Sequence, residues 1–365
     1  MISDTYFQAS KKFRNIVITA CADTTERAAQ RGAQYGVAAM STDALLDSPD
    51  VDIVLNLTPP NVHAAIDLQA LARGKHVYSE KPFAVSMDEA KQILTTAAER
   101  NLRVGCAPDT FLGGSLQSAR KFLDDGWIGK PVAGTAIVAS RGPEKWPHAP
   151  MFYDKGAGPM MDLGPYYCTA LVNLLGPARS VMAAATRGTA TRTMGAEVAP
   201  AYRDRYKPYG PYPVNVNTHL SGTVEFQNGA LVTVIASFDV YKHGHAPIEL
   251  YGTEGSLQIG DPNFFGSPLK ICRREWRNPE TPLEWQEAPI LFPYTDNCRS
   301  IGLADMADAI AKGRPHRCNS ALACHVLEIM LAFEASAASG RRVELKTTCD
   351  RPAPLPMGLE EGEIR

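Results

Sequence analysis

The sequence predicts an α/β protein in which a doubly wound domain precedes an α+β domain with a large, mostly antiparallel sheet. Short apolar runs alternate with helical stretches over about the first hundred residues, as is typical of a parallel sheet covered on both faces. After about residue 110, longer strand-like runs follow one another, and two of them flank Asn228-Gly229, a strong hairpin signal. We therefore expect a first domain over residues 1–108, a second over 109–345 and a tail over 346–365. The tail is rich in Pro and Glu, so we expect it to be poorly ordered from about Pro352.

The strands expected in the first domain are its continuous apolar runs, which are rich in β-branched residues. They cover Ile16–Ala22, Val51–Leu57, His76–Ser79 and Leu102–Ala107. Helical composition follows the first three strands, over Thr24–Tyr35, Asn61–Arg73 and Ser86–Arg100. The last helix opens with a capping box, in which the Ser86 and Glu89 side chains satisfy backbone donors of the first turn.

The second domain is expected to consist mainly of longer strands. They cover Val132–Ser140, Val181–Gly188, His219–Phe226, Leu231–Val240, Ile248–Tyr251 and Ser256–Ile259. Helices are expected over Gly164–Leu175, Ser300–Lys312 and Ser320–Ser339. Because the strands outnumber the helices, we expect the helices to cover one face of the sheet.

The composition argues against several classes of protein. The formal net charge of −2 gives no reason to expect nucleic acid or an anionic membrane as a partner. No run of 18 apolar residues is present and the first residues do not resemble a secretory signal, so we expect a cytoplasmic protein without a membrane span. The eight cysteines form no C-x-x-C pair, which favours free thiols in a reducing compartment. His316, Cys318, Cys324 and His325 match no zinc spacing, so we expect no metal.

Ligands of a doubly wound domain bind at the carboxyl ends of the strands, and three loops fall there. Asp23 closes the first strand, where a carboxylate can accept hydrogen bonds from an adenosine ribose and repel a 2′-phosphate. The alternative for Asp23 is a solvated turn residue that caps the next helix. Thr58-Pro59-Pro60-Asn61 ends the second strand, where its rigid backbone can lie along a cofactor or simply form a turn with Asn61 as a helix cap.

Glu80-Lys81-Pro82 ends the third strand, an unusual place for a charged pair. As an ammonium, Lys81 can bind a substrate hydroxyl and stabilise the alkoxide character that develops as hydride leaves. With its pKa lowered by burial, it can also take part in proton transfer. The alternative is a surface ion pair, which contributes little to stability.

A glycine-rich run, Gly156-Ala157-Gly158-Pro159, leads into Asp162 and then into a helix that carries Tyr166. The glycines allow close backbone approach. Asp162 and Tyr166 are four residues apart, so a helical turn places both side chains on one face. The alternative is a capping aspartate followed by aromatic residues of the core.

These segments, in this order, resemble the Gfo/Idh/MocA family of oxidoreductases, and the similarity covers nearly the whole chain. The similar segments are Cys21-Ala22-Asp23, Thr58-Pro59-Pro60-Asn61-Val62-His63, Gly74-Lys75-His76-Val77, Glu80-Lys81-Pro82, the glycine-rich run into Asp162, and Tyr251-Gly252-Thr253-Glu254-Gly255. The resemblance implies an N-terminal Rossmann domain that binds NAD in preference to NADP. It also implies a second domain that holds the substrate and the interface of a homodimer or homotetramer. The implied reaction moves hydride between the nicotinamide and a hydroxyl or carbonyl carbon of a sugar, sugar derivative or cyclitol.

The resemblance further implies roles for individual residues. Asp23 would contact the adenosine ribose. The rest of the cofactor would be lined by Thr58, Pro59, Asn61, His63, Glu80, Lys81 and Pro82. Lys81 would also reach the substrate, and Asp162 would bind a substrate hydroxyl. Weaker candidates for the substrate pocket are Arg141, Trp146, His148, Tyr153, His243 and His245.

One departure from the family pattern concerns the general base. The family commonly has a histidine four residues after the aspartate, and here that residue is Tyr166. A phenol has a pKa of about 10, so it is a poor base at neutral pH unless a nearby cation lowers its pKa. Our hypothesis is that Lys81 does so, and the alternative is that Lys81 or Asp162 accepts the proton.

A second departure concerns the pyrophosphate of the cofactor. A Rossmann domain should begin with a strand and G-x-G-x-x-G, but the residues from Met1 to Tyr6 are similar to the family sequence just after that loop. We therefore expect the first strand and the glycine loop to be missing and a strand edge to be unpaired. Either the start was assigned downstream of the true one, or dinucleotide binding has been lost. In the second case the protein would be a non-catalytic sugar- or protein-binding member of the fold.

Overall fold

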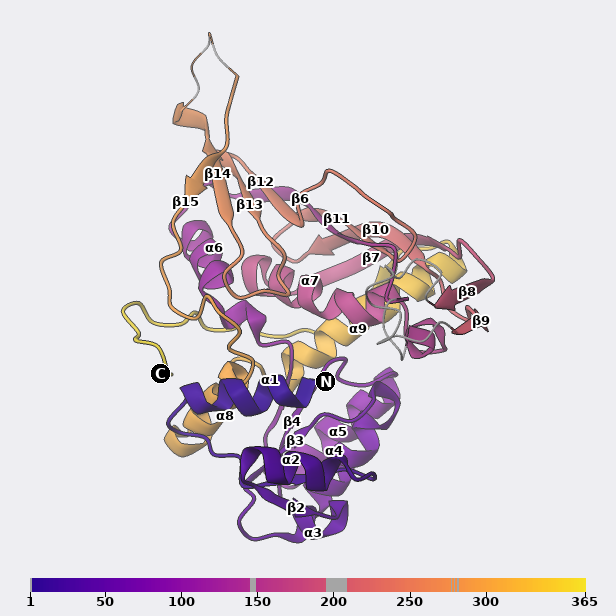
Figure 1. Cartoon of the computed structure of the whole chain (residues 1–365). Helices are drawn as coiled ribbons and strands as arrows, with labels where there is room; N and C mark the ends of the chain where they lie inside the picture. Colours follow the sequence, from indigo (N-terminus) through magenta and orange to yellow (C-terminus); the bar gives the residue numbers. More distant parts are fainter. Residues whose placement is uncertain (1, 145–148, 195–208, 277, 279, 281) are drawn as a thin grey trace.

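The computed structural model describes residues 2–144, 149–194, 209–276, 278, 280 and 282–365. These residues form a small α/β half and a larger half built on one wide sheet (Figure 1). In Figure 1 the wide sheet lies above the small half, and the first helix, α1, lies between them.

The N-terminal half contains two small parallel sheets in place of one. The strands are β1 (Ala20–Ala22) beside β2 (Ala38–Met40), and β3 (Ile53–Asn56), β4 (His76–Ser79) and β5 (Val104–Cys106) in that order. Among the described residues, no strand lies between β1 and β3, which agrees with the expectation of an unpaired edge at this place. The strand predicted over Ile16–Ala22 is limited to its last three residues, because only these have β2 as a neighbour. Val17 is 81% exposed.

Helices connect these strands much as the sequence predicts. They are α1 (Ile2–Ala9), α2 (Arg27–Tyr35), α3 (Thr42–Asp47), α4 (His63–Ala72) and α5 (Met87–Glu99), with short 3-10 turns η1 (Ser10–Lys12), η2 (Pro60–Val62) and η3 (Thr110–Leu112). At the start of α5 the Ser86 hydroxyl accepts a hydrogen bond from the Glu89 amide at 3.2 Å. The Glu89 carboxylate in turn accepts from the amide of Val85 at 3.0 Å, one residue earlier than a capping box requires.

The second half is built on a nine-stranded sheet. Its strands, in spatial order, are β15 (Gln286–Ala288), β14 (Leu269–Arg273), β13 (Gly255–Ile259), β12 (Ile248–Gly252), β6 (Pro131–Ala139), β11 (Leu231–Ser237), β10 (His219–Phe226), β7 (Ala178–Thr186) and β16 (Val343–Glu344). The β6–β11 pair is parallel and the other pairs are antiparallel, so the prediction of a mostly antiparallel sheet is confirmed. Two further strands, β8 (Thr191–Met194) and β9 (Tyr209–Pro213), pair separately. Short 3-10 turns occur at η4 (Ala149–Tyr153) and η6 (Arg274–Trp276).

Helices cover the buried face of this sheet. α7 (Pro159–Leu175) packs on β6 and β11, α9 (Ser320–Ser339) packs on β7, and α6 (Gly114–Asp124) packs on β13. Of the helices described, α9 is long and apolar enough to cross a membrane, but 56% of its most apolar window is buried inside the protein. Its composition is therefore explained by its place in the core.

The end of the chain returns to the N-terminal half. α8 (Ile301–Lys312) and α9 both contact β5. The tail, which we expected to be poorly ordered, instead packs against the protein through the buried side chains of Leu355, Leu359 and Ile364. The Arg317 guanidinium donates hydrogen bonds to main-chain oxygens of the tail, including that of Ala353 at 3.0 Å. The expectation of disorder rested on the Pro and Glu content of the tail. It failed because three apolar side chains, spaced along the tail, anchor it to the protein.

Gly105 of β5 lets the C-terminal elements approach the small sheet. A methyl group at this position would lie 2.7 Å from the Tyr78 ring and 3.1 Å from the main-chain oxygen of Cys318.

We predict that Gly105→Ala lowers the free energy of unfolding by about 1–3 kcal/mol, as overpacking of a core typically does. Urea denaturation would measure this change. Gly244→Ala is the control, because a methyl group at that position would have no neighbouring atom within 4 Å. We expect the control to change stability by less than about 0.5 kcal/mol, and equal effects of both variants would contradict the prediction.

Candidate active site

Two strand-end loops lie side by side at the carboxyl edge of the small sheet. β3 and β4 are parallel neighbours, with Asn56 opposite Ser79 in the last register pair. The loop that begins at Thr58 therefore runs beside Glu80-Lys81-Pro82, as the strand-end argument predicted. Together they form the floor of the candidate site.

Lys81 and Asp162 form an ion pair that joins the two halves of the protein. The Lys81 Nζ lies 2.8 Å from Asp162 Oδ1 and also donates a hydrogen bond to the main-chain oxygen of Asp162. The two side chains are only 15% and 14% exposed. Burial disfavours the charge of Lys81, but Asp162, Tyr166 and Glu80 outweigh it and hold the pKa of Lys81 well above its ordinary value. Lys81 is therefore an ammonium at neutral pH, and the sequence-based alternative of Lys81 as a proton acceptor does not fit the protein in this state.

Tyr166 lies on α7 one turn after Asp162, with its ring centroid 5.2 Å from Lys81 Nζ. Burial raises the pKa of its phenol, while Lys81 and Arg299 lower it by a smaller amount. The hypothesis that Lys81 lowers the pKa of Tyr166 is therefore correct in sign for that pair, but burial outweighs it. The phenol is protonated at neutral pH, which suits a proton donor better than a base.

The structure brings to this site residues that the sequence analysis missed. Tyr6 of α1 donates a hydrogen bond to Glu80 Oε1 at 2.7 Å, and the Lys81 amide donates to Glu80 Oε2 at 3.0 Å. Glu80, 9% exposed, thus supports the turn that presents Lys81. The Arg299 guanidinium lies 6.0 Å from the Tyr166 ring centroid and donates to Asn263 Oδ1 at 2.7 Å. No local pattern around Tyr6 or Arg299 predicts these contacts, because both arise from the packing of distant segments.

Asp23 fulfils the capping role that the sequence offered and leaves one oxygen open for the other role. Its Oδ1 accepts hydrogen bonds from the amide and hydroxyl of Thr25, at 2.8 and 2.7 Å, so it caps the turn that leads to α2. The side chain is exposed, and Oδ2 has no hydrogen-bond partner in the described part of the protein. One carboxylate oxygen is thus open to a ligand such as a ribose hydroxyl.

The residues of the Thr58 loop do not all face the same way. Pro59 and Asn61 are exposed, whereas His63 is 1% exposed and hydrogen bonded through both ring nitrogens to main-chain oxygens. His63 therefore supports the loop from beneath, and direct contact with a cofactor, which the resemblance implied, does not fit this burial.

The weaker candidates for the substrate pocket lie away from the Lys81–Asp162 pair or outside the described residues. Tyr153 is fully buried in a cluster with Tyr212 and Phe238. Arg192 lies 5.4 Å from the Tyr153 ring centroid and donates to the main-chain oxygen of Arg141 at 3.2 Å. Leu163, the neighbour of Asp162, packs against this cluster.

Four histidine and tryptophan candidates remain. His243 and His245 lie on an exposed loop, with their rings stacked 5.9 Å apart. Trp146 and His148 lie outside the described residues. The structure therefore groups Lys81, Asp162 and Tyr166.

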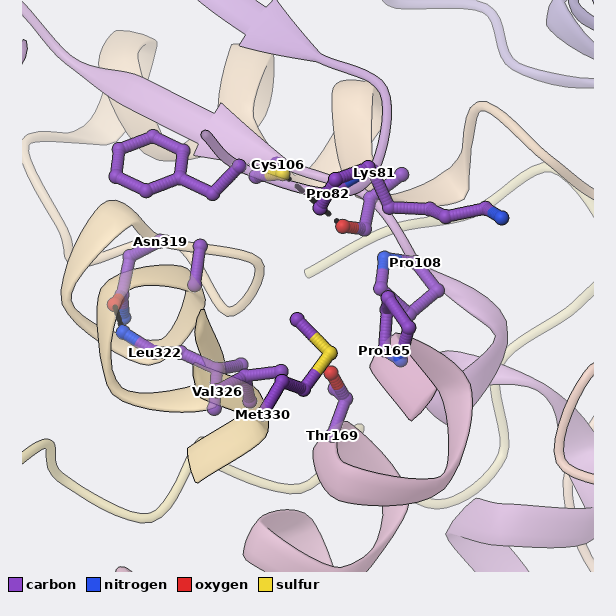
Figure 2. A pocket seen from close by; sticks show the side chains of 13 residues that line it. Lys81, Pro82, Cys106, Pro108, Pro165, Thr169, Asn319, Leu322, Val326 and Met330 are labelled. Carbon is purple, nitrogen blue, oxygen red and sulfur yellow. Dashed lines mark hydrogen bonds between the residues drawn. The ribbon is translucent and has the colours of Figure 1, made fainter. Parts of the chain in front are cut away.

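A cavity lies behind the Lys81-Pro82 turn, between α7, α9 and the ends of β4 and β5 (Figure 2). Its lining is largely apolar and includes Pro82, Cys106, Pro165, Val326 and Met330. Figure 2 shows the Lys81 ammonium pointing away from this space. The Lys81 ammonium therefore lies outside this largely apolar cavity.

The residues present fit the two ends of an NAD molecule. The free oxygen of Asp23 suits the adenosine ribose, and Lys81, Pro82 and Thr58 surround the place for the nicotinamide at the ends of β3 and β4.

Comparison with known families identifies both halves. Residues 2–107 match the family model described as an oxidoreductase family with an NAD-binding Rossmann fold. Residues 116–258 match the model of the GFO/IDH/MocA C-terminal domain. The expectation of NAD as cofactor agrees with the first of these descriptions.

Characterised relatives and solved structures agree with these matches. The chain is 26% identical over 248 residues to a levoglucosan dehydrogenase of Pseudarthrobacter phenanthrenivorans, covering 64% of this chain and 62% of that protein. It is 27% identical over 241 residues to a 1,5-anhydro-D-fructose reductase of Ensifer adhaerens, covering 63% and 65%. The alignments thus span somewhat less than two thirds of these relatives.

The fold is shared over a greater length. A levoglucosan dehydrogenase in complex with NADH and levoglucosan superposes with a TM-score of 0.78 at 21% identity, over 94% of this chain and 95% of that one. An NAD-binding oxidoreductase from Klebsiella pneumoniae superposes with a TM-score of 0.77 at 23% identity, over 94% of each chain. At these identities the similarity establishes the fold alone.

Proposed function

Because the chain belongs to the Gfo/Idh/MocA family of oxidoreductases, we propose that it is an NAD-dependent dehydrogenase or reductase of sugars, sugar derivatives or cyclitols. The observation that carries this proposal is the shielded Lys81–Asp162 pair beside Tyr166, at the strand end where the nicotinamide would lie. Lys81 supplies a charged donor from the loop after β4, and α7 supplies an acceptor and a phenol one turn apart. These are the groups needed to hold a hydroxyl and move its proton.

Each residue of this group has a distinct part in the proposed reaction. A bound NAD cofactor would accept or supply the hydride at the C4 atom of its nicotinamide. Lys81, held as an ammonium, donates a hydrogen bond to the reacting oxygen and stabilises its negative charge. Asp162 fixes the direction of the ammonium through Oδ1, which leaves its other oxygen to accept from a neighbouring substrate hydroxyl. In carbonyl reduction, the Tyr166 phenol gives its proton to the oxygen. In alcohol oxidation, the phenolate takes that proton.

We predict a pH dependence that follows from the raised pKa of Tyr166. Alcohol oxidation needs the phenolate, so its kcat/KM should rise with pH, by about tenfold per unit between pH 7 and 9. Reduction uses the phenol, so its pH profile should be flat over this range. In Tyr166→Phe the slope for oxidation should disappear and kcat should fall by about 10²–10⁴-fold. Steady-state assays in both directions would show this, and an unchanged profile in the variant would exclude Tyr166 as the proton carrier.

We also infer that a second copy covers the outer face of the wide sheet. On this face Met182 is 59% exposed and Leu231 is 50% exposed, and Thr223 and Thr233 form a register pair beside them. Such a mixture of apolar and hydroxyl side chains fits a self-complementary interface. Analytical ultracentrifugation should therefore find a dimer or tetramer, and Met182→Lys should shift it towards the monomer. A monomeric wild-type protein would contradict this inference.

The decisive experiment is a screen of monosaccharides, anhydrosugars and cyclitols for reduction of NAD, with binding of NADH measured in parallel by its fluorescence. We expect turnover with at least one polyol. In Lys81→Met the kcat for that substrate should fall by about 10²–10³-fold while NADH binding persists. Lys91→Met on exposed α5 is the control and should behave as the wild type. If NADH does not bind, the function proposed here is wrong.

A further inference from the structure

His63 lies beneath both loops of the candidate site. It is the first residue of α4, and its ring extends between the loop after β3 and the loop after β4. Nε2 lies 2.7 Å from the main-chain oxygen of Thr58, and Nδ1 lies 2.8 Å from that of Pro82. One buried ring thus connects the loop expected to line the cofactor to the turn that presents Lys81.

A network of buried polar groups holds this ring and the strand ends. Asn56 donates through Nδ2 to the main-chain oxygen of His63 at 3.1 Å and to Asp67 Oδ1 at 2.7 Å. The Oδ1 of Asn56 accepts from the amide and hydroxyl of Thr58 at 3.1 and 2.7 Å. The Ser79 hydroxyl donates to the Asp67 carboxylate at 2.6 Å. Asn56, His63, Asp67 and Ser79 are each at most 2% exposed, so water competes little for these bonds.

The partners of His63 determine its chemistry. Both are carbonyl oxygens, which only accept, so both contacts are hydrogen bonds only if each ring nitrogen carries a proton. Neither ring nitrogen is left to bind a ligand or to move a proton.

We propose that His63 is a positioning residue that clamps the two loops, and that its two hydrogen bonds have separable effects. The bond to Thr58 sets the backbone along which the cofactor lies. The bond to Pro82 sets the turn from which Lys81 reaches Asp162 and the substrate. The kinetic consequence rests on the function proposed above, but the clamp itself does not.

Two substitutions separate the bonds because their amide nitrogens reach different places. The amide of Asn is about where Nδ1 of His lies, so His63→Asn keeps the donor to Pro82 and loses the donor to Thr58. The amide of Gln is about where Nε2 lies, so His63→Gln does the reverse. His63→Phe loses both.

Hydrogen–deuterium exchange of the full-length protein tests the clamp without any substrate. We expect several-fold faster exchange in residues 57–62 alone for His63→Asn and in residues 82–86 alone for His63→Gln. Both segments should exchange faster in His63→Phe. Identical patterns in the Asn and Gln variants, or faster exchange spread through the N-terminal half, would overturn the proposal.

Kinetics give a second readout that a merely structural role would not produce. His63→Asn should weaken NADH binding about tenfold with a smaller change in kcat. His63→Gln should lower kcat by up to about 100-fold with NADH binding nearly unchanged, because a small displacement of Lys81 misplaces the reacting oxygen. Equal losses of both parameters in both variants would overturn the separable roles. If the wild-type protein turns over no substrate, the proposed function fails, but exchange still decides whether the clamp exists.

His325 offers a matched control on α9. It is also fully buried, with Nε2 accepting from the Ala178 amide at 2.9 Å and Nδ1 3.0 Å from the Thr347 hydroxyl. His325→Asn and His325→Gln should lower the stability of the protein and leave exchange in both loops as in the wild type. Faster loop exchange in these variants would show that any buried histidine produces the effect, and would overturn the assignment to His63.

Discussion

The ion pair between Lys81 and Asp162 is the interaction on which the arrangement of the site depends. Lys81 comes from the end of a strand in the small sheet, and Asp162 comes from the first turn of a helix that packs on the wide sheet. Removing one partner from a buried pair costs about 3–5 kcal/mol, because the other charge is left uncompensated. The pair therefore connects the two halves of the protein at the candidate site, where a substrate oxygen would be bound in the proposed function.

Burial leads to different protonation states for Lys81 of this pair and for the neighbouring Tyr166. The carboxylate of Asp162 keeps Lys81 charged in spite of desolvation, whereas Lys81 and Arg299 offset only part of the rise in the pKa of Tyr166 that burial causes. The site thus contains a permanent cation and a phenol that holds its proton. This division of roles suits the reduction of a carbonyl at neutral pH, and it makes alcohol oxidation dependent on an alkaline medium or on changes that accompany ligand binding.

Position in the sequence made Lys81 and Asp162 candidates, because one follows a strand at the edge where ligands bind and the other follows a glycine-rich run at the start of a helix. Position alone left structural alternatives open for both, and the family resemblance favoured the functional interpretation. The role of His63 as a residue that lines the cofactor was implied by the resemblance alone. Only the three-dimensional structure shows that its ring is directed inward. The prediction that Tyr153 lines the substrate pocket does not fit its complete burial, because an aromatic residue near a glycine-rich run can lie in a pocket or in the core.

The sequence by itself predicted a parallel α/β half followed by a mostly antiparallel sheet, the order of most strands along the chain and the Lys81, Asp162 and Tyr166 group. These features depend on local composition and on spacing within one segment. The tertiary structure added Tyr6 and Arg299 to the site and placed Glu80 under the Lys81 turn and His63 beneath the loops. It also decided the protonation of Lys81 and Tyr166, because desolvation depends on atoms from distant parts of the chain. The position of Lys81 at a strand end was thus predictable from the sequence, but its protonation state and the orientation of its side chain were not.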